Sequence, residues 1–259
     1  MIVDCHTHIK SLSDSLAVAD FLEVSEKVDA CFLLEDSCDE GADSKQLSEQ
    51  VRQNDKLIGF ASVNPLEDKL TDKAITSAIS GAGFHGAVLY CSQKGFHPTH
   101  SRAMRFYAIA EELGIPVFFH NSPPFTSEAI LDYAQPYLID EVARTFPTLK
   151  IIIGSMGQPF VDQTLCMLCK HPNVYADLTI DPTKIWQVYN IVINAHEASV
   201  MDKLLFGSGY PFAEAGSCIE TLLGFNKLLA DTNLPGVPRE KIRAIIERDT
   251  LSLFDIAAK

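Results

Sequence analysis

Short apolar segments alternate with longer segments of mixed polarity along the whole chain. Eight of the apolar segments are four to six residues long and nearly continuous in valine, isoleucine, leucine and phenylalanine. Parallel strands that are covered on both faces have this composition, whereas half-exposed strands alternate apolar with polar residues. The pattern predicts strands over Ile2–Cys5, Asp29–Leu34, Leu57–Ser62, His85–Tyr90, Ile115–His120, Lys150–Gly154, Asn173–Asp177 and Lys203–Gly207.

The segments between these strands have the spacing of amphipathic helices. In the clearest one, Thr99–Leu113, apolar residues recur every three or four positions, Ser101 can cap the start, and Gly114 ends the helix before Pro116. Comparable segments are Thr71–Ser80, Ser127–Thr145, Gln158–Lys170, Pro182–Ala198, Ala213–Ala230 and Pro238–Ala258.

This alternation is even from one end of the chain to the other, without a linker or an internal repeat. The chain has 259 residues, and (β/α)8 barrels run near ~250 residues. We therefore predict the α/β class and a single (β/α)8 TIM-barrel domain over residues 1–259. An open doubly wound sheet is the alternative, because strand count alone does not separate the two folds.

Composition limits the partners and the location. Hydrophobic residues make up 47% of the chain and the formal net charge is −13, so a nucleic acid or an anionic membrane surface would be repelled. The start at Met1 has no signal-peptide pattern, and no apolar run is long enough to span a membrane. The seven cysteines are odd in number and scattered. We expect a cytoplasmic protein with free thiols, in which Cys166, Cys169 and Trp186 pack in the core.

The strongest chemical signal is Asp4-Cys5-His6-Thr7-His8 at the end of the first strand. Residues two apart on a strand share one face, so His6 and His8 can hold a divalent cation together. Asp4 would lie on the same face, one step deeper, where it could orient a ligand.

A third histidine, His120, closes the fifth predicted strand. It would lie at the C-terminal rim of the barrel, where the active sites of such barrels are found. A histidine at this place is more often a rim residue bonded to backbone, but the His-x-His pair makes the ligand interpretation the better one.

These stretches resemble the amidohydrolase superfamily, in particular the branch with aminocarboxymuconate semialdehyde decarboxylase and related lactonases. The resemblance covers nearly the whole chain and rests on the segments Ile2–His8, Gly114–His120, Phe146–Gly157, His171–Asp177 and Leu204–Phe212. It implies a divalent metal, zinc first, ligated by His6, His8 and His120, and a homodimer.

The chain departs from the family pattern at two positions. The family has a histidine after the sixth strand, where this sequence has Ser155, and an aspartate after the eighth strand, where it has Gly209. In the family the histidine assists the water or polarises the substrate, and the aspartate ligates the metal and acts as general base. Neither role transfers to a serine hydroxyl or to a residue without a side chain. Three neutral imidazoles still suffice for zinc and leave a position open for water.

Other residues at the predicted mouth are candidates for the missing roles. Glu35 follows the second strand and is our first candidate for a replacement base, while Asp177 closes the seventh strand and could support a ligand from behind. Ser208 and Gly209 lie in a loop that could bind an anionic substrate group through backbone amides.

Three functions remain open on the sequence. The first is a metal-dependent hydrolase that acts on a small carboxylated, lactone or amide substrate. The second is a catalytically silent barrel that binds a small ligand or a partner, favoured by the two departures. The third is a non-oxidative decarboxylase, implied by the resemblance.

Overall fold

Eight parallel strands lie in one sheet in the order in which they occur along the chain. The computed structural model describes residues 1–9, 12, 14–36, 44–120, 123 and 125–257. The strands are β1 Val3–Thr7, β2 Ala30–Leu34, β3 Leu57–Ser62, β4 Gly86–Leu89, β5 Val117–Phe119, β6 Ile151–Ile153, β7 Val174–Asp177 and β8 Leu204–Leu205. All eight predicted strands are present, with ends shifted by up to two residues.

The first and last strands meet and close the sheet. The Cys5 N–H donates to the Phe206 carbonyl at 2.9 Å, and Thr7 forms a parallel bridge with Tyr210. A doubly wound sheet would reverse its strand order in the middle, whereas this order runs from β1 to β8 without reversal. The prediction of a (β/α)8 TIM barrel is therefore confirmed.

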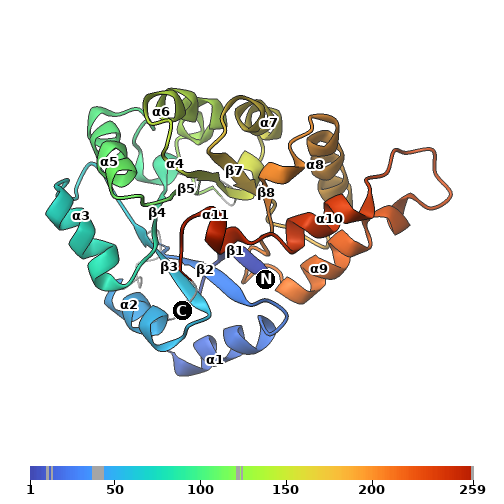
Figure 1. The fold of residues 1–259 in the computed structure, drawn as a ribbon, viewed down its shortest axis with the longest axis horizontal. Coiled ribbons are helices and arrows are strands. Elements are labelled where there is room, and N and C mark those ends of the chain that lie inside the picture. Colours follow the sequence, from blue (N-terminus) through green and yellow to red (C-terminus); the bar gives the residue numbers. More distant parts are fainter. Residues whose placement is uncertain (10–11, 13, 37–43, 121–122, 124, 258–259) are drawn as a thin grey trace.

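Helices surround the strands, and Figure 1 shows α11 lying across one end of the barrel. The α-helices are α1 Ser15–Val24, α2 Ser44–Gln53, α3 Asp72–Ala78, α4 Cys91–Lys94, α5 Ser101–Glu112, α6 Asp140–Thr145, α7 Val161–Lys170, α8 Ile185–Glu197, α9 Ala215–Leu223, α10 Arg239–Ile246 and α11 Thr250–Leu253. Short 3-10 helices are η1 Ser80–Ala82, η2 Leu131–Ala134, η3 Pro136–Ile139, η4 Gly154–Gly157, η5 Met201–Lys203 and η6 Phe225–Leu229. The helices α1, α2 and α4 were not among the predicted ranges. Within the described residues, none of these helices has the length and apolar character needed to cross a bilayer.

Three predicted helices are interrupted. The segment Ser127–Thr145 consists of η2, η3 and the short α6, because Pro136 has no N–H to donate within a helix. The helix predicted over Ala213–Ala230 ends at Leu223, before Gly224. Residues 247–249 separate α10 from α11 in the third segment, whose predicted end at Ala258 lies outside the described residues.

Alternate strand residues fill the barrel interior. In β2, the side chains of Ala30, Phe32 and Leu34 belong to the inner cluster, whereas Cys31 and Leu33 belong to the layer under the helices. This is the two-residue alternation of a strand covered on both faces.

The C-terminal segment closes the N-terminal end of the barrel. The Phe254 ring lies 6.3 Å from Phe32 of β2 and 5.4 Å from Tyr175 of β7. Because only β1 and β8 separate β2 from β7 in the closed sheet and Phe254 belongs to the inner cluster, its ring spans the barrel interior between them. The barrel is therefore solid at this end, and its accessible mouth is the C-terminal end of the strands.

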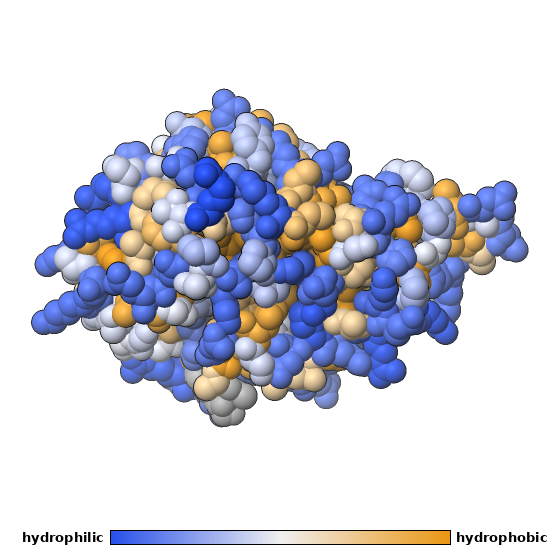
Figure 2. Space-filling model, turned by 45° about the horizontal axis from the view of Figure 1, so that its top comes forward, coloured by the Kyte–Doolittle hydropathy of each residue, from blue (hydrophilic) through white to orange (hydrophobic). Residues whose placement is uncertain are grey.

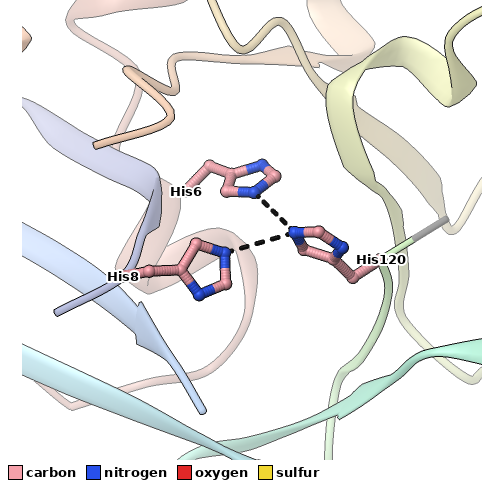
Figure 3. Close-up of side chains that lie close together, drawn as sticks. All are labelled: His6, His8 and His120. Carbon is pink, nitrogen blue, oxygen red and sulfur yellow. Dashed lines mark hydrogen bonds between the residues drawn. The ribbon is translucent and has the colours of Figure 1, made fainter. Parts of the chain in front are cut away.

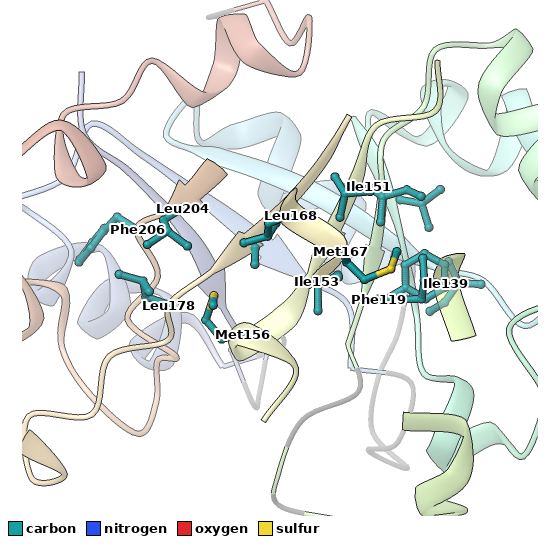
Figure 4. Close-up of a cluster of buried hydrophobic side chains, with 14 of the residues drawn as sticks. Phe119, Ile139, Ile151, Ile153, Met156, Met167, Leu168, Leu178, Leu204 and Phe206 are labelled. Atoms are coloured by element: carbon teal, nitrogen blue, oxygen red, sulfur yellow. The ribbon is translucent and has the colours of Figure 1, made fainter. Parts of the chain in front are cut away.

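The outer layer joins strands to helices. Figure 4 shows part of it, where Ile151 and Ile153 of β6 lie near Met167 and Leu168 of α7. Burial of this layer and of the inner cluster supplies the main driving force for the fold.

The core predictions for three residues were wrong. Cys166 and Cys169 are exposed on α7, because the buried face of that helix is formed by Thr164, Met167 and Leu168. Trp186, at the start of α8, is 66% exposed and stacks on Tyr189 with ring centroids 5.4 Å apart. Helical spacing alone did not show which face would meet the barrel.

Candidate metal centre

A β-bulge in β1 sets the direction of the histidines. Asp4 pairs with Cys31 and Thr7 pairs with Leu33, so β1 carries one extra residue over this interval. Val3 and Cys5 face the barrel interior. The extra residue lets His6 face the interior too, where its ring lies 5.3 Å from Phe118.

The rings of His6, His8 and His120 converge at the mouth (Figure 3). The Nε2 atom of His120 lies 3.1 Å from Nε2 of His6 and 3.2 Å from Nε2 of His8. Two of the ligand atoms come from the end of β1 and the third from the residue after β5. The structure thus brings together the three residues that the sequence predicts as metal ligands.

Hydrogen bonds behind two of the rings show which atoms face the centre. Nδ1 of His8 lies 3.1 Å from the Leu34 carbonyl, and Nδ1 of His6 lies 3.2 Å from both carboxylate oxygens of Asp177. These acceptors require a proton on Nδ1, so in the neutral imidazole the Nε2 atom of each ring presents a lone pair. A proton on His120 Nε2 could be donated to the Nε2 atom of only one of these two rings at a time. The cluster therefore has the polarity of a cation site.

The spacing of the nitrogens fits a transition metal. Zn–N bonds of 2.0–2.1 Å in tetrahedral geometry place two ligand nitrogens about 3.3 Å apart. The two Nε2 separations from His120, 3.1 and 3.2 Å, are close to this value, and all three ligand atoms lie within 4.8 Å of one another. The residues present therefore fit one divalent ion with three imidazole ligands.

Burial keeps two of the imidazoles neutral. It lowers the pKa of His8 from 6.5 to about 3, and the nearby His6 lowers it further. Burial also holds the pKa of His120 well below its usual value, with added contributions from His6 and His8. Both rings are then neutral at neutral pH, with one nitrogen free of a proton, as a metal ligand must be.

Asp177 occupies the supporting place that the sequence predicts for it. It closes β7, is fully buried, and accepts from His6 Nδ1. It also accepts from the Ser155 N–H at 2.8 Å. A carboxylate in this place fixes the tautomer and the orientation of a ligand histidine.

Sequence reasoning missed Thr179, which contacts the same ring. Its Oγ1 lies 2.9 Å from His6 Nδ1 and 2.9 Å from the Ser155 Oγ, and it donates to Asp177. The spacing Asp177-x-Thr179 repeats that of His6-x-His8. This i, i+2 spacing at the end of a strand was the signal that could have found it.

The two positions that depart from the family pattern both lie behind His6. Ser155 is buried in η4 with a left-handed backbone, φ 49°, and its hydroxyl reaches Thr179 rather than the centre of the three histidines. Gly209 also has a left-handed backbone, φ 70°, and a Cβ built there would lie 2.6 Å from Thr179 Cγ2. A side chain at position 209 would collide with Thr179.

The predicted place of Asp4 was wrong. Since Val3 and Cys5 face the interior, Asp4 points to the opposite side of β1. Its Oδ1 accepts from the backbone N–H of His6 at 3.3 Å and of Ser208 at 2.9 Å. Burial raises its pKa to about 6. Asp4 thus links the end of β1 to the segment after β8. Its partners in these hydrogen bonds are backbone N–H groups and not imidazole rings.

Glu35, our candidate replacement base, makes contacts away from the histidines. One carboxylate oxygen accepts from the Ser62 N–H at 2.6 Å and the other from the Ser44 hydroxyl. It lines a cavity of about 710 Å³ together with residues of α2 and α3. Among the described residues, no carboxylate joins the three histidines within 4.8 Å.

The amides needed for an anion site already have acceptors. The Ser208 N–H donates to Asp4, the Gly209 N–H donates to the His6 carbonyl at 2.9 Å, and the Tyr210 N–H donates to the Ser208 hydroxyl. The predicted anion site at Ser208 and Gly209 therefore has no free backbone amide at positions 208–210.

Comparison with known proteins agrees with this architecture. The family model described as amidohydrolase matches residues 3–247. No curated protein sequence matches the chain. The chain belongs to the amidohydrolase family.

Solved structures share the fold at low sequence identity. A probable 2-pyrone-4,6-dicarboxylic acid hydrolase from Acinetobacter baumannii is 16% identical with a TM-score of 0.69, over 98% of this chain and 99% of that chain. An uncharacterized TIM-barrel protein from Bordetella bronchiseptica is 16% identical with a TM-score of 0.73, over 98% of both chains. A dihydroxybenzoic acid decarboxylase from a Polaromonas species, with manganese and 2-nitroresorcinol bound, is 16% identical with a TM-score of 0.64, over 98% of this chain and 96% of that chain.

Proposed function

We propose that this chain is a metal-dependent hydrolase that holds one divalent ion, zinc by preference, at His6, His8 and His120. Its substrate is a small carboxylated, lactone or amide compound. The observation that carries the proposal is the convergence of three imidazole Nε2 atoms, two of them with lone pairs directed at the centre. Without a cation, this arrangement of lone pairs is repulsive.

The bound ion would act as a Lewis acid on a substrate oxygen and lower the pKa of a bound water to roughly 7. The chain's own residues would hold the ion and fix the orientation of the imidazole rings that bind it. Asp177 holds the Nδ1 proton of His6, and the Leu34 carbonyl holds that of His8. The apolar ring of Phe118 packs against the His6 ring. The bonds between the ion and the imidazoles would therefore lie in a medium of low polarity.

A general base is the weak part of the hydrolase proposal. Proton transfer by a positioned side chain contributes ~10²–10⁴-fold to such a reaction, and no described carboxylate stands with the three histidines. We therefore expect slow hydrolysis, and Glu35 stays a prediction that its present contacts do not support.

Decarboxylation is the second candidate. It does not need a base to activate water, so the absence of a carboxylate among the described residues around the histidines favours it. Two structural neighbours are described as decarboxylases of dihydroxybenzoates, one of them with bound manganese.

The test of the proposal begins with metal content. We expect about one zinc, manganese or iron per chain in protein purified without chelator, and none in His6→Ala/His8→Ala. The same pair of proteins is then assayed on lactones, amides, esters and hydroxybenzoates, with ring opening and release of carbon dioxide measured separately. Turnover that disappears in the double variant supports an enzyme, and its products decide between the two reactions.

Two outcomes would contradict the proposal. Wild-type protein that binds no zinc after incubation has no metal centre. Protein that binds zinc without turnover on any of these classes would be the catalytically silent barrel that binds a ligand or a partner.

Location and partners are part of the same proposal. We place the chain in the cytoplasm, supported by free thiols at all six cysteines that the structure describes, with Cys38 outside that part. We propose a homodimer with a small-molecule ligand and no nucleic acid, on the net charge of −13. Figure 2 shows hydrophilic residues over most of one face with small apolar groups between them. Light scattering at several concentrations would test the dimer.

A further inference from the structure

A closed polar cluster lies behind His6, on the side of the ring away from the other two histidines. It consists of Asp177 at the end of β7, Thr179 two residues later and Ser155 in η4. All three are linked to one another and two of them contact His6 Nδ1. The shortest contact of that nitrogen, at 2.9 Å, is with the hydroxyl of Thr179.

Every hydrogen-bonding position of the Thr179 hydroxyl is used. A threonine hydroxyl has one proton to donate and two lone pairs that accept. Its proton goes to Asp177 Oδ1, and its lone pairs face Ser155 Oγ–H and His6 Nδ1–H. Asp177 is fully buried, Ser155 is 5% exposed and Thr179 is partly buried, so water has little access to the carboxylate and serine ends of these bonds.

Glycine backbone encloses the cluster from the β8 side. A Cβ at Gly207 would lie 2.8 Å from Asp177 Oδ1 and 3.1 Å from His6 Cβ, and one at Gly209 would lie 2.6 Å from Thr179 Cγ2. The Gly209 N–H also donates to the His6 carbonyl at 2.9 Å. The hydroxyl of Thr179 thus faces the imidazole while its methyl group packs against the loop that holds the backbone of His6.

We propose that Thr179 is a positioning residue of the metal centre, which joins Ser155 and Asp177 to His6 and keeps the Nε2 lone pair of His6 directed at the ion. The proposal rests on the metal centre proposed above. The hydroxyl carries this role, and the methyl group excludes a side chain at position 209.

The experiment separates the hydroxyl from the methyl group. Thr179→Val keeps the shape and removes the hydroxyl, whereas Thr179→Ser keeps the hydroxyl and removes the methyl. Thr183→Val is the matched control, because the Thr183 hydroxyl is bonded to Asp181 and lies on the exposed surface. Zinc affinity is measured by competition with a chromophoric chelator, and folding is checked by circular dichroism.

We expect Thr179→Val to weaken zinc binding roughly tenfold to a hundredfold, the usual effect of losing a bond behind a ligand histidine. Thr179→Ser and Thr183→Val should bind as the wild type does. Thr179→Val that folds normally and binds zinc with unchanged affinity would overturn the proposal.

A second measurement does not need metal. The nitrogen resonances of ¹⁵N-labelled histidine in the metal-free protein distinguish a protonated from an unprotonated ring nitrogen. We expect His6 to carry its proton on Nδ1 in the wild type and in Thr179→Ser, and a mixture of tautomers in Thr179→Val. A single Nδ1–H tautomer in Thr179→Val would count against the proposal. A wild type with this tautomer but no zinc affinity would contradict the metal centre instead.

Discussion

The two sides of the histidine cluster are held by different forces. On the β1 side, His6 Nδ1 has three oxygen atoms within 3.2 Å, from Asp177 and Thr179. On the β5 side, His120 Nδ1 is buried without a hydrogen-bond partner among the described residues. The His120 ring is held by packing, with Tyr90 at 4.8 Å and Phe118 at 6.3 Å between centroids.

This difference separates orientation by hydrogen bonds from orientation by shape. Hydrogen bonds to Nδ1 fix both the plane of the ring and the position of its proton. Aromatic packing fixes the plane and leaves the proton free to move between the nitrogens. We therefore expect His6 to be in its metal-binding form before the ion arrives, and His120 to reach that form on binding.

Removal of either ligand has the largest expected effect. His6→Ala and His120→Ala should each weaken zinc binding by roughly 10³-fold or more, because two imidazoles remain for the ion. The variants should differ in stability without metal. His6→Ala leaves the buried Asp177 carboxylate with fewer hydrogen-bond partners, which should lower the free energy of unfolding by about 1–3 kcal/mol. His120→Ala removes no such hydrogen bond and should not cause this loss. Urea unfolding of both variants in chelator measures this, and equal midpoints would contradict the comparison.

Asp177→Asn should come next in size. It exchanges one acceptor oxygen for a donor beside His6 Nδ1 and should weaken zinc binding by about tenfold to a hundredfold. The control is Asp181→Asn, four residues further on, whose carboxylate is bonded to Thr183. Titration with zinc compares the two, and an equal loss in both variants would show that the effect is not specific to His6.

Gly209→Ala tests the packing on the β1 side. The left-handed backbone alone costs an alanine about 1–2 kcal/mol, and the contact with the Thr179 methyl adds to that. In a Thr179→Ser background we expect the loss of unfolding free energy to be smaller by about 1 kcal/mol. Thermal unfolding of the four proteins gives the coupling, and strictly additive losses would mean that the two residues do not press on each other.

The smallest effect concerns a region remote from the histidines and serves as a reference. Bonds to Lys170 and His171 lower the pKa of Asp140, at the start of α6, from 3.8 to about 2. Between these values the unfolded chain binds more protons than the folded one, so this stabilisation exists above about pH 4 and is lost as the pH falls towards 2. Asp140→Asn should lower the unfolding free energy by about 1 kcal/mol at pH 7, since partial exposure weakens the bonds. Zinc affinity should not change, and the stability difference should shrink in acid.

The elements of the fold were predictable because each depends on local spacing. Eight continuous apolar segments predicted the strands, and helical spacing with a closing glycine marked α5 within two residues at its start and one at its end, although its N-cap is His100 and not the predicted Ser101. Helix interruptions after Ser127 and after Leu223 were missed, since an amphipathic pattern continues across a break when both parts pack on the same strand layer.

The cluster of three histidines was predictable because two of them lie two residues apart in the sequence and the third follows a strand. Their supporting residues were predictable only in part. Asp177 ends a strand and lies behind His6 as expected, whereas the only signal for Thr179 was its i, i+2 spacing from Asp177, which does not show that β7 ends beside His6. Asp4 was misplaced because a bulge between Asp4 and Thr7 interrupts the alternation.

The order of residues was therefore enough to predict an eight-stranded barrel with three imidazoles at its mouth. Only the closed barrel decides what stands behind each imidazole, because closure brings β7 and the loop after β8 against β1 from more than 170 residues away. It also decides what a side chain at position 209 would meet, since a Cβ there would lie 2.6 Å from Thr179 Cγ2. Such contacts depend on the register of the paired strands and on the bulge in β1. Both are fixed only when the sheet closes on itself.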